Sequence, residues 1–173
     1  MRKKRKTKKW LITLLVFAVL LGVGYFAVSR GYDMFMRQMY PRSYAEIVEY
    51  EAQENGLDPA FVYAVIKTES NFDPNAKSSA NALGLMQMTP ETFAWIQSKY
   101  RGDPQYTADD LYTPEINIRY GCRLLAYLID RYELWDTALC AYNAGMGNAN
   151  SWLQNAEYST DGKTITKMCI RDR

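Results

Sequence analysis

"DPAFVYAVIKTES" (58–70) is the stretch from which the fold of this chain can be argued most directly. Asp58 is a favourable N-cap residue, and Pro59 suits the first helical position because its φ is already helical and its missing N–H is not needed there. The apolar residues that follow predict a helix that is mostly buried. Glu69 lies in the last turn of this helix, three residues after Ile66, and so continues its apolar face.

Helix-start signals recur along the chain after residue 42. Two Thr-Pro pairs, at 89–90 and 113–114, combine a capping residue with a proline, and Ser43 and Glu46 have the spacing of a capping box. The further helices that these signals and the apolar periodicity predict are 43–56, 90–99, 114–131, 135–145 and 148–155. No segment alternates apolar and polar residues for long enough to predict a strand. We therefore expect an all-α fold, a compact bundle of short helices without internal repeats.

The N-terminal residues have the composition of a membrane anchor. The first nine, MRKKRKTKK, carry seven basic side chains. Residues 10–28, WLITLLVFAVLLGVGYFAV, form an apolar segment, and a helix of this length covers about 28 Å, close to the roughly 30 Å hydrocarbon core of a bilayer. The positive-inside rule keeps residues 1–9 in the cytoplasm and places everything after residue 30 outside it. Residues 29–42 are then a stalk.

A cleaved signal peptide is the alternative for this segment. The apolar region of a signal peptide normally runs about 7–15 residues, which is shorter than 10–28, but "AVS" (27–29) resembles a weak cleavage site. The chain is expected to be a single-pass protein of the cell membrane if the segment is retained, and a secreted protein if it is cleaved. In both cases the domain after the stalk is exported.

The charge of the exported part differs from that of the whole chain. Once the seven leading basic residues are set aside, 14 Lys and Arg remain against 19 Asp and Glu, a net charge near −5. Binding to nucleic acid needs clustered Lys and Arg to neutralise phosphates, so no nucleic-acid partner is expected. The sequence has no histidine, which excludes Ser-His and Cys-His nucleophile systems and most catalytic zinc sites. Any acid–base chemistry must use carboxylates.

The three cysteines, Cys122, Cys140 and Cys169, lack the CxxC spacing typical of metal sites. We expect Cys122 and Cys140 to be small core residues on neighbouring helices, since Cys122 belongs to an apolar series with Ile118 and Leu125 at helical spacing. A Cys122–Cys140 disulfide is the alternative. It is permitted outside the cytoplasm but needs Cα atoms within about 7 Å.

Glu69 is the carboxylate in the least ordinary position. Apolar surroundings and the partial negative charge at the end of a helix both favour its protonated form. A carboxyl that keeps its proton near neutral pH can serve as a general acid. The structural alternative is that Glu69 simply ends an amphipathic helix and turns to water, and periodicity alone does not decide between the two.

Four sequence features occur in a fixed order along the predicted helices. "TES" (68–70) is followed by Ser78, then by "ALGLMQMTP" (82–90) and "CAYNAGMGN" (140–148). In this order and spacing they resemble the soluble-type lytic transglycosylases of glycoside hydrolase family 23, which are related in fold to goose-type lysozyme. The resemblance covers residues 43–157 and implies that this segment is a catalytic domain with a lysozyme-like fold.

The resemblance implies a reaction as well as a fold. The family cleaves the MurNAc–GlcNAc β-1,4 bond of peptidoglycan without adding water and leaves a 1,6-anhydromuramoyl end. Glu69 matches its single catalytic acid, which protonates the glycosidic oxygen and then, as carboxylate, takes the proton of the C6 hydroxyl as that oxygen closes on C1. An internal nucleophile of this kind needs no second carboxylate, unlike ordinary glycosidases. Asp73, which lies beyond the helix beside Pro74, is expected only to cap a turn.

Four more residues match substrate-binding positions of the family. Gln87 and Ser78 match residues beside the acid or the sugar, and Tyr142 and Asn143 match the family's "AYN" motif. Each has a structural alternative: the Gln87 amide can pin its own loop, Ser78 can be a turn residue, Tyr142 can pack in the core and Asn143 can tie helix to loop. Asn81 stands where the family often has Gly, but Asn tolerates left-handed backbone angles, so the turn is expected to survive.

The resemblance implies no metal and no organic cofactor. Its implied partners are the glycan strands of peptidoglycan, with a cell-wall or secretion complex as a further candidate. A hydrolytic muramidase of the same fold and a non-catalytic wall-binding scaffold are the alternatives. Residues 158–173 are expected to be a tail, whereas the family usually continues here with another helix that carries an aromatic residue near the cleft. The ending "KMCIRDR" (167–173) resembles adapter read-through, in which case Cys169 is not a native residue.

Overall fold

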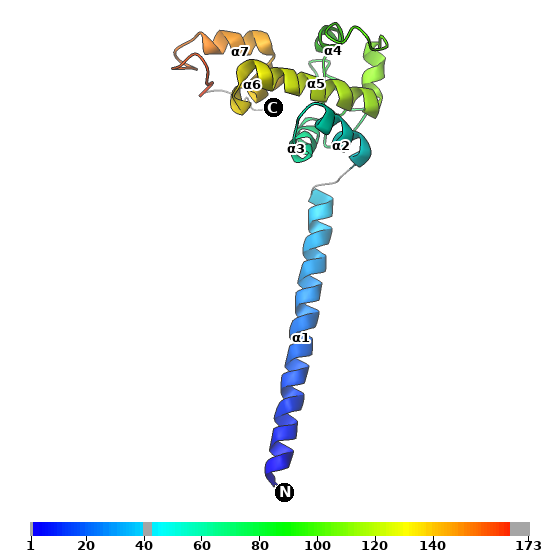
Figure 1. The fold of residues 1–173 in the computed structure, drawn as a ribbon, viewed down its shortest axis with the longest axis vertical. Helices are drawn as coiled ribbons and strands as arrows, with labels where there is room; N and C mark the ends of the chain where they lie inside the picture. The colour runs from blue at the N-terminus through cyan, green and yellow to red at the C-terminus, as the bar shows by residue number, and fades with distance from the viewer. Residues whose placement is uncertain (1, 40–42, 167–173) are drawn as a thin grey trace. The chain divides into compact units, whose positions relative to one another are not determined.

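The computed structural model describes residues 2–39 and 43–166 of the chain. The chain divides into two compact units, Met1–Arg42 and Ser43–Arg173. The described residues form helices joined by turns (Figure 1). No strand occurs among them, and the isolated bridges pair Leu83 with Lys77 and with Met88. The all-α fold class is therefore confirmed.

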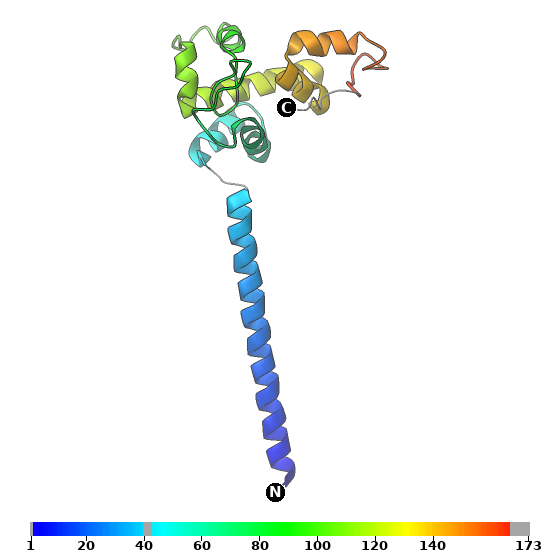
Figure 2. The same cartoon turned by 180° about the vertical axis from the view of Figure 1, so that it is seen from behind.

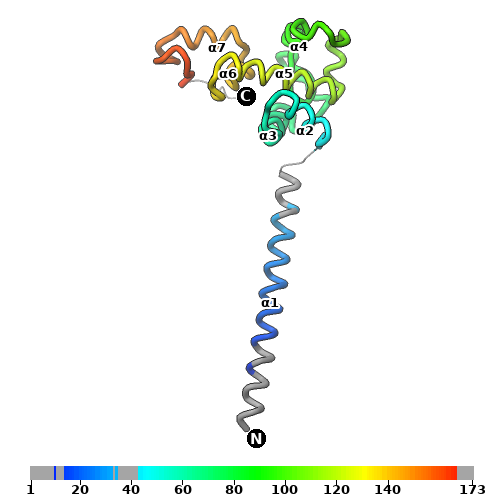
Figure 3. The backbone as a smooth tube through the Cα atoms, viewed as in Figure 1, coloured from blue at the N-terminus to red at the C-terminus, as the bar shows by residue number. Residues whose placement is uncertain are grey.

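The first unit contains one helix, α1 (Arg2–Met39). Within it, Leu14–Tyr32 is a 19-residue segment with a mean hydropathy of 1.9, long and apolar enough to cross a membrane. This segment overlaps the predicted anchor 10–28 and extends beyond its end. The span is the long coloured stretch of α1 in Figure 3. The helix ends at Met39, so the described part of the expected stalk is helical (Figure 1). The rest of the expected stalk, residues 40–42, lies outside the described residues.

The second unit contains a series of short helices. They are α2 (Ala45–Glu54), α3 (Pro59–Ser70), α4 (Pro90–Gln97), the 3-10 helix η1 (Ala108–Tyr112), α5 (Pro114–Tyr132), α6 (Trp135–Ala144) and α7 (Met146–Leu153). Each α-helix predicted for this part of the chain is present, within a few residues of its expected bounds. The helix η1 was not expected.

Two of the predicted helix starts have the expected caps. At the start of α3, the Asp58 carboxylate accepts a hydrogen bond of 2.8 Å from the Ala60 N–H, and Pro59 follows directly. At the start of α4, the Thr89 hydroxyl accepts a hydrogen bond of 3.2 Å from the Thr92 N–H. The sequence signals therefore locate both helices correctly.

The capping box predicted at Ser43 is wrong. Helix α2 begins after Tyr44, which has a left-handed backbone with φ 63° and makes no side-chain cap. A capping box needs an N-cap residue with an extended backbone, and the left-handed Tyr44 takes that position instead of Ser43. The box occurs elsewhere, at η1, where the Asp110 carboxylate accepts a hydrogen bond of 2.7 Å from the Thr107 N–H.

Helix α5 is the centre of the second unit. It packs against α2, α4, η1 and α6, and α6 in turn packs against α7. Helices α2 and α4 lie on opposite sides of α5 when the unit is seen from the front and from behind (Figures 1 and 2). Because α5 has neighbours on several sides, it buries residues on more than one face.

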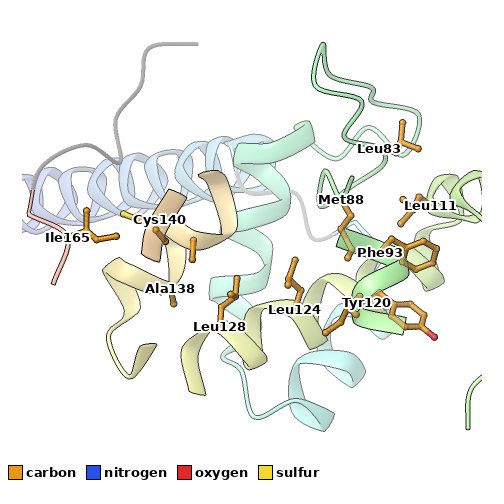
Figure 4. Packing of buried hydrophobic residues seen from close by; sticks show 13 residues of the cluster. Leu83, Met88, Phe93, Leu111, Tyr120, Leu124, Leu128, Ala138, Cys140 and Ile165 are labelled. Atoms are coloured by element: carbon orange, nitrogen blue, oxygen red, sulfur yellow. The ribbon is translucent and has the colours of Figure 1, made fainter. Parts of the chain in front are cut away.

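Two hydrophobic cores meet at α5. The α4–α6 core contains Leu83, Met88, Phe93, Ile96, Leu111, Tyr120, Leu124, Leu128, Ala138, Cys140, Ala141, Ala149 and Ile165 (Figure 4). The α2–α3 core contains Val48, Ala52, Leu57, Val62, Val65, Ile66, Leu85, Met86, Ile118, Cys122 and Leu125. The predicted apolar series of α5 therefore lies in the second of these cores, and Tyr120, Leu124 and Leu128 form a further face in the first.

The two cysteines of the described residues are both buried. Cys122 is a free thiol, and burial, with a smaller contribution from the charge of Glu51, raises its pKa to about 12. The alternative of a Cys122–Cys140 disulfide is therefore wrong, and the expectation that both cysteines fill the core is confirmed. Cys169 lies outside the described residues.

The described part of the expected tail packs against the helices. The Thr137 hydroxyl of α6 donates a hydrogen bond of 3.0 Å to the Lys163 carbonyl, and the Ile165 side chain is 7% exposed within the α4–α6 core. The Thr166 N–H donates to the Tyr158 carbonyl at 2.9 Å. Residues 158–166 are thus part of the folded unit, and residues 167–173, with the ending read as adapter sequence, lie outside the described residues.

Candidate active site

Glu69 lies partly buried in the last turn of α3, where it was expected. The helix ends at Asn71, whose left-handed backbone (φ 51°) lets its N–H donate to the Lys67 carbonyl. The neighbouring Ser70 hydroxyl donates a hydrogen bond of 2.7 Å to the Leu85 carbonyl. The end of α3 that carries Glu69 is therefore tied to the loop that contains the "GLMQ" sequence.

The 82–88 loop is a tight turn with side chains in both cores. Leu83 and Met88 exchange backbone hydrogen bonds of 2.9 and 3.2 Å, which close the turn. These two side chains enter the α4–α6 core, whereas Leu85 and Met86 enter the α2–α3 core. The loop is therefore anchored from two sides, which leaves Gln87 as its partly exposed residue.

Asn117, near the start of α5, holds this loop by hydrogen bonds to its backbone. Its role was not predicted from the sequence. Its side chain is 0% exposed. The Asn117 oxygen accepts a hydrogen bond of 2.7 Å from the Met86 N–H, and its nitrogen donates to the carbonyls of Leu83 (3.0 Å) and Leu111 (2.8 Å). The sequence signal available was a polar residue directly before Ile118, on a helix with several buried faces, and periodicity does not say what such a residue binds.

Two glycines, also not predicted, allow the loop to approach α5 closely. A Cβ atom at Gly84, whose φ is +73°, would lie 2.2 Å from the Leu111 carbonyl oxygen and 2.3 Å from the Asn117 amide nitrogen. A Cβ atom at Gly121 would lie 2.2 Å from the Met86 sulfur. All three distances are far below van der Waals contact, so larger residues here would displace the loop.

Tyr142 of α6 completes the site. Its hydroxyl donates a hydrogen bond of 2.7 Å to the Met86 carbonyl. Burial raises the pKa of Tyr142 well above its ordinary value of 10.0, and the charges of the nearby Glu69 and Cys122 raise it further. The phenol is therefore close enough to Glu69 to sense its charge and remains protonated at all ordinary pH values. The structure thus brings Glu69, the loop and the "AYN" helix together.

The contacts of Gln87 and Ser78 match their structural alternatives. The Gln87 amide nitrogen donates to the carbonyls of Gly84 (2.9 Å) and Ala76 (3.2 Å), so this half of the amide holds the loop. The Ser78 hydroxyl oxygen accepts a hydrogen bond of 3.1 Å from the Ala82 N–H, as in a turn. The Gln87 oxygen and the Ser78 hydroxyl proton take no part in these bonds, so the substrate-binding roles remain predictions.

Three further residues of the sequence analysis lie near the site motifs in the sequence. Asn143 is exposed on α6, one residue after Tyr142. Asn81 has a left-handed backbone with φ 59°, as expected for an asparagine that replaces glycine. Asp73 is exposed, and its carboxylate accepts a hydrogen bond of 2.9 Å from the Asn75 N–H, which is a turn-capping role. Among the described residues, no group of three or more His, Cys, Asp or Glu side chains is arranged to hold a metal ion.

The model of the transglycosylase SLT domain matches residues 46–165. The chain belongs to this family. The expected resemblance is thereby confirmed, and the match reaches past the predicted end of the catalytic domain at residue 157.

The SLT domain of this chain has curated relatives among lytic transglycosylases. It is 34% identical over 117 residues to membrane-bound lytic murein transglycosylase C of Actinobacillus pleuropneumoniae, a match that covers 61% of this chain and 32% of the relative. It is 30% identical over 125 residues to soluble lytic murein transglycosylase of Escherichia coli, covering 70% of this chain and 19% of the relative. The chain therefore spans less than a third of the length of either relative.

Solved structures share the fold of the SLT domain. The lytic transglycosylase Slt of Pseudomonas aeruginosa, in an inactive mutant with glutamine in place of a glutamate, aligns with a TM-score of 0.63 and 30% identity over 69% of this chain and 20% of that one. The 70 kDa soluble lytic transglycosylase of Escherichia coli aligns with a TM-score of 0.64 and 26% identity over 71% of this chain and 20% of that one. The observed helices are thus those of a lytic transglycosylase fold.

Proposed function

We propose that this chain is a peptidoglycan lytic transglycosylase. It cleaves the MurNAc–GlcNAc β-1,4 bond and forms a 1,6-anhydromuramoyl end instead of adding water. The observation that carries the proposal is the grouping of one carboxyl, Glu69, with the "GLMQ" loop and Tyr142 inside an SLT domain. The names of the relatives, which are lytic murein transglycosylases, support the same substrate.

Glu69 acts in both steps of the proposed reaction. As a carboxylic acid it gives its proton to the glycosidic oxygen, and the C1–O bond breaks as positive charge develops at C1. As a carboxylate it then accepts the proton of the C6 hydroxyl while the C6 oxygen bonds to C1. The proton count is balanced, because Glu69 ends protonated and ready for the next bond.

The surroundings of Glu69 suit this double role. Asp73, a nearby carboxylate in the sequence, is engaged in capping an exposed turn, so the proposal assigns the reaction to Glu69 and an internal nucleophile. Tyr142 stays protonated and neutral beside the acid because burial holds its pKa high. The related structure from Pseudomonas aeruginosa is that of an inactive mutant in which glutamine replaces one glutamate.

The proposed substrate contacts use the Gln87 amide oxygen and the Ser78 hydroxyl proton, which take no part in the hydrogen bonds given above for these residues. The Gln87 amide oxygen can accept from a sugar hydroxyl, and the Ser78 hydroxyl can donate to an acetamido carbonyl. Asn143, which is exposed one residue from Tyr142, can bind the same strand. These three residues orient the sugar, and Glu69 carries out the proton transfers.

The Glu69→Gln variant tests the proposal. Gln keeps the shape of the side chain but cannot give and retake the proton, so we expect the release of muropeptides from purified peptidoglycan to fall by at least about a thousandfold. The matched control is Asp73→Asn, which removes a nearby carboxylate outside the proposed chemistry and should keep wild-type turnover. Unchanged turnover in Glu69→Gln would remove Glu69 from the acid role.

Mass spectrometry of the wild-type products tests the reaction type. Anhydromuramoyl ends are lighter than hydrolysed ends by one water, and we expect them as the main product. Hydrolysed ends alone would identify a muramidase. Binding to peptidoglycan without any cleavage, in both wild type and Glu69→Gln, would identify a wall-binding scaffold.

A further inference from the structure

We propose that Asn117 is a positioning residue of this active site: it fixes the backbone of Met86 so that the Tyr142 hydroxyl is held beside the acid. Asn117 contacts neither Glu69 nor the expected sugar positions in any hydrogen bond described above. It acts through the loop. The inference rests on the proposed function for its catalytic consequence, but its structural part stands on the contacts alone.

The orientation of the Asn117 amide is fixed by its partners. Its oxygen meets an N–H group, that of Met86, and its nitrogen meets two carbonyl oxygens, those of Leu83 and Leu111. Backbone groups cannot exchange donor and acceptor roles, so a flipped amide would oppose like partners at all three contacts. A fully satisfied buried amide of this kind rigidifies the segments that it joins.

The loop touches α5 at two points one helical turn apart. The backbone of Gly84 lies against the Asn117 amide, and the Met86 side chain lies against Gly121, four residues further along α5. Met86 is therefore held by its N–H, by its side chain and, through its carbonyl, by Tyr142. Helix α5 thus fixes the backbone of Met86, the same residue whose carbonyl Tyr142 of α6 contacts.

Tyr142 links the position of the Met86 carbonyl to the surroundings of Glu69. A phenol has one proton, and Tyr142 donates it to the Met86 carbonyl, so its oxygen can only accept a hydrogen bond from a neighbouring acid. If Asn117 no longer holds the Met86 backbone, the Met86 carbonyl can move, and the Tyr142 hydroxyl that donates to it loses its fixed position beside the acid.

The test compares two buried carboxamides in the full-length chain in detergent micelles. Asn117→Asp replaces the donor nitrogen with an oxygen that faces two carbonyls, and Asn117→Ser is a milder change that removes the same donors. The matched control is Gln97→Glu, because Gln97 is 4% exposed and pins the backbone of Tyr106 through both halves of its amide. All variants are assayed where thermal unfolding shows them to be folded.

The expected result separates positioning from stability. Both Asn117 variants should lose about 10- to 100-fold in kcat with KM changed by less than about threefold, since misplacement by about 1 Å is enough for such a loss. Gln97→Glu should lose stability but keep kcat within about threefold. A kcat near wild type in a folded Asn117 variant, or an equal loss in Gln97→Glu, would overturn the proposal.

Hydrogen exchange gives a readout that needs no turnover. In wild type the Met86 amide is bonded to a buried side chain, so we expect it to be protected, and the Asn117 variants should lose at least about tenfold of the protection across residues 83–88. Gln97→Glu should leave these amides protected. Unchanged protection in both Asn117 variants would refute the positioning role, whether or not the wild-type chain cleaves peptidoglycan.

Discussion

Tyr142 shows how one hydrogen bond can define the chemistry of a residue. The resemblance to a family places a phenol near the acid, but it does not say which group receives the phenol proton. In the structure this proton goes to the Met86 carbonyl. The Tyr142 proton is therefore engaged by the 82–88 loop, and the phenol oxygen is left to accept a hydrogen bond.

The Tyr142→Phe variant tests this role. The ring packing is kept, but the Met86 carbonyl loses its donor and the acid loses a polar neighbour. We expect a loss of about 1–2 kcal/mol in the free energy of unfolding and about a tenfold loss in kcat. Tyr132→Phe is the control, since the Tyr132 hydroxyl donates to the Asn150 side chain at 2.9 Å and should affect stability only. Equal kcat values for the two variants would contradict the assignment.

The close approach at Gly84 gives a prediction about stability. A Cβ atom there would collide with a backbone oxygen, and the left-handed φ adds strain. Gly84→Ala should therefore lower the free energy of unfolding by about 2–4 kcal/mol. Gly102→Ala is the control, because no atom lies within 4 Å of a Cβ built at Gly102. Thermal unfolding of the two variants measures the difference, and similar melting temperatures would show that the loop can shift without cost.

The candidate site could be predicted from the sequence only in part, for a physical reason. Glu69, Gln87 and Tyr142 could be proposed as site residues because their motifs are local in sequence. Their hydrogen-bond partners depend on how the 82–88 loop runs over α5, which no local pattern describes. Asn117 was missed because two of its three hydrogen bonds reach partners, Met86 and Leu83, that lie more than 30 residues away in the sequence. The third reaches Leu111, 6 residues away, in another helix.

At the scale of helices, local signals predicted more than they did at the site. Proline at the first position and apolar periodicity identified α3, α4 and α5, because these signals act within one or two turns. The second buried face of α5, with Tyr120, was missed, since it depends on α4 and η1 packing against it. The capping box at Ser43 was wrong because the left-handed Tyr44 takes the N-cap position.

The segment between α4 and η1 is tied to α5 by a charge pair that makes stability depend on pH. The Asp103 carboxylate accepts hydrogen bonds from the Arg123 guanidinium and from the Tyr120 hydroxyl, the latter at 3.1 Å. The bond from Arg123 is the main cause that lowers the pKa of Asp103 below its ordinary value. The Arg123 guanidinium also lies 4.0 Å from the centre of the Tyr100 ring. The pair therefore stabilises the fold when Asp103 is ionised.

Asp103→Asn should be less stable than wild type by about 1–2 kcal/mol at pH 7. Because the folded-state pKa is lowered, this stabilisation is fully present above the unfolded value of about 3.9 and is lost as pH falls through the folded value. The gap between the two proteins should thus close in acid. Urea unfolding at pH 7 and below pH 4 measures it, with the exposed Asp109→Asn as control. A gap independent of pH would rule out the ion pair as its source.

At the scale of the whole chain, the two units differ in what they bury. The second unit has its own cores, whereas the described side chains of the candidate span Leu14–Tyr32 are almost all exposed, and its 18-residue window is 0% buried. An apolar helix with exposed side chains is more stable in a bilayer than in water. We therefore propose that α1 anchors the chain and that the SLT domain faces the peptidoglycan.

Protease treatment of intact spheroplasts tests this topology. The seven basic residues among the first nine should keep an N-terminal epitope tag in the cytoplasm under the positive-inside rule, so the tag should survive while the SLT domain is digested. In the control, these basic residues are replaced by Gln, and we expect a larger fraction of inverted chains whose tag is lost. Digestion of the tag with survival of the domain in the unmodified chain would reverse the proposed orientation. A full-size chain in the membrane fraction would support a retained anchor. A shortened chain in the soluble fraction would mean that the segment is cleaved as a signal peptide.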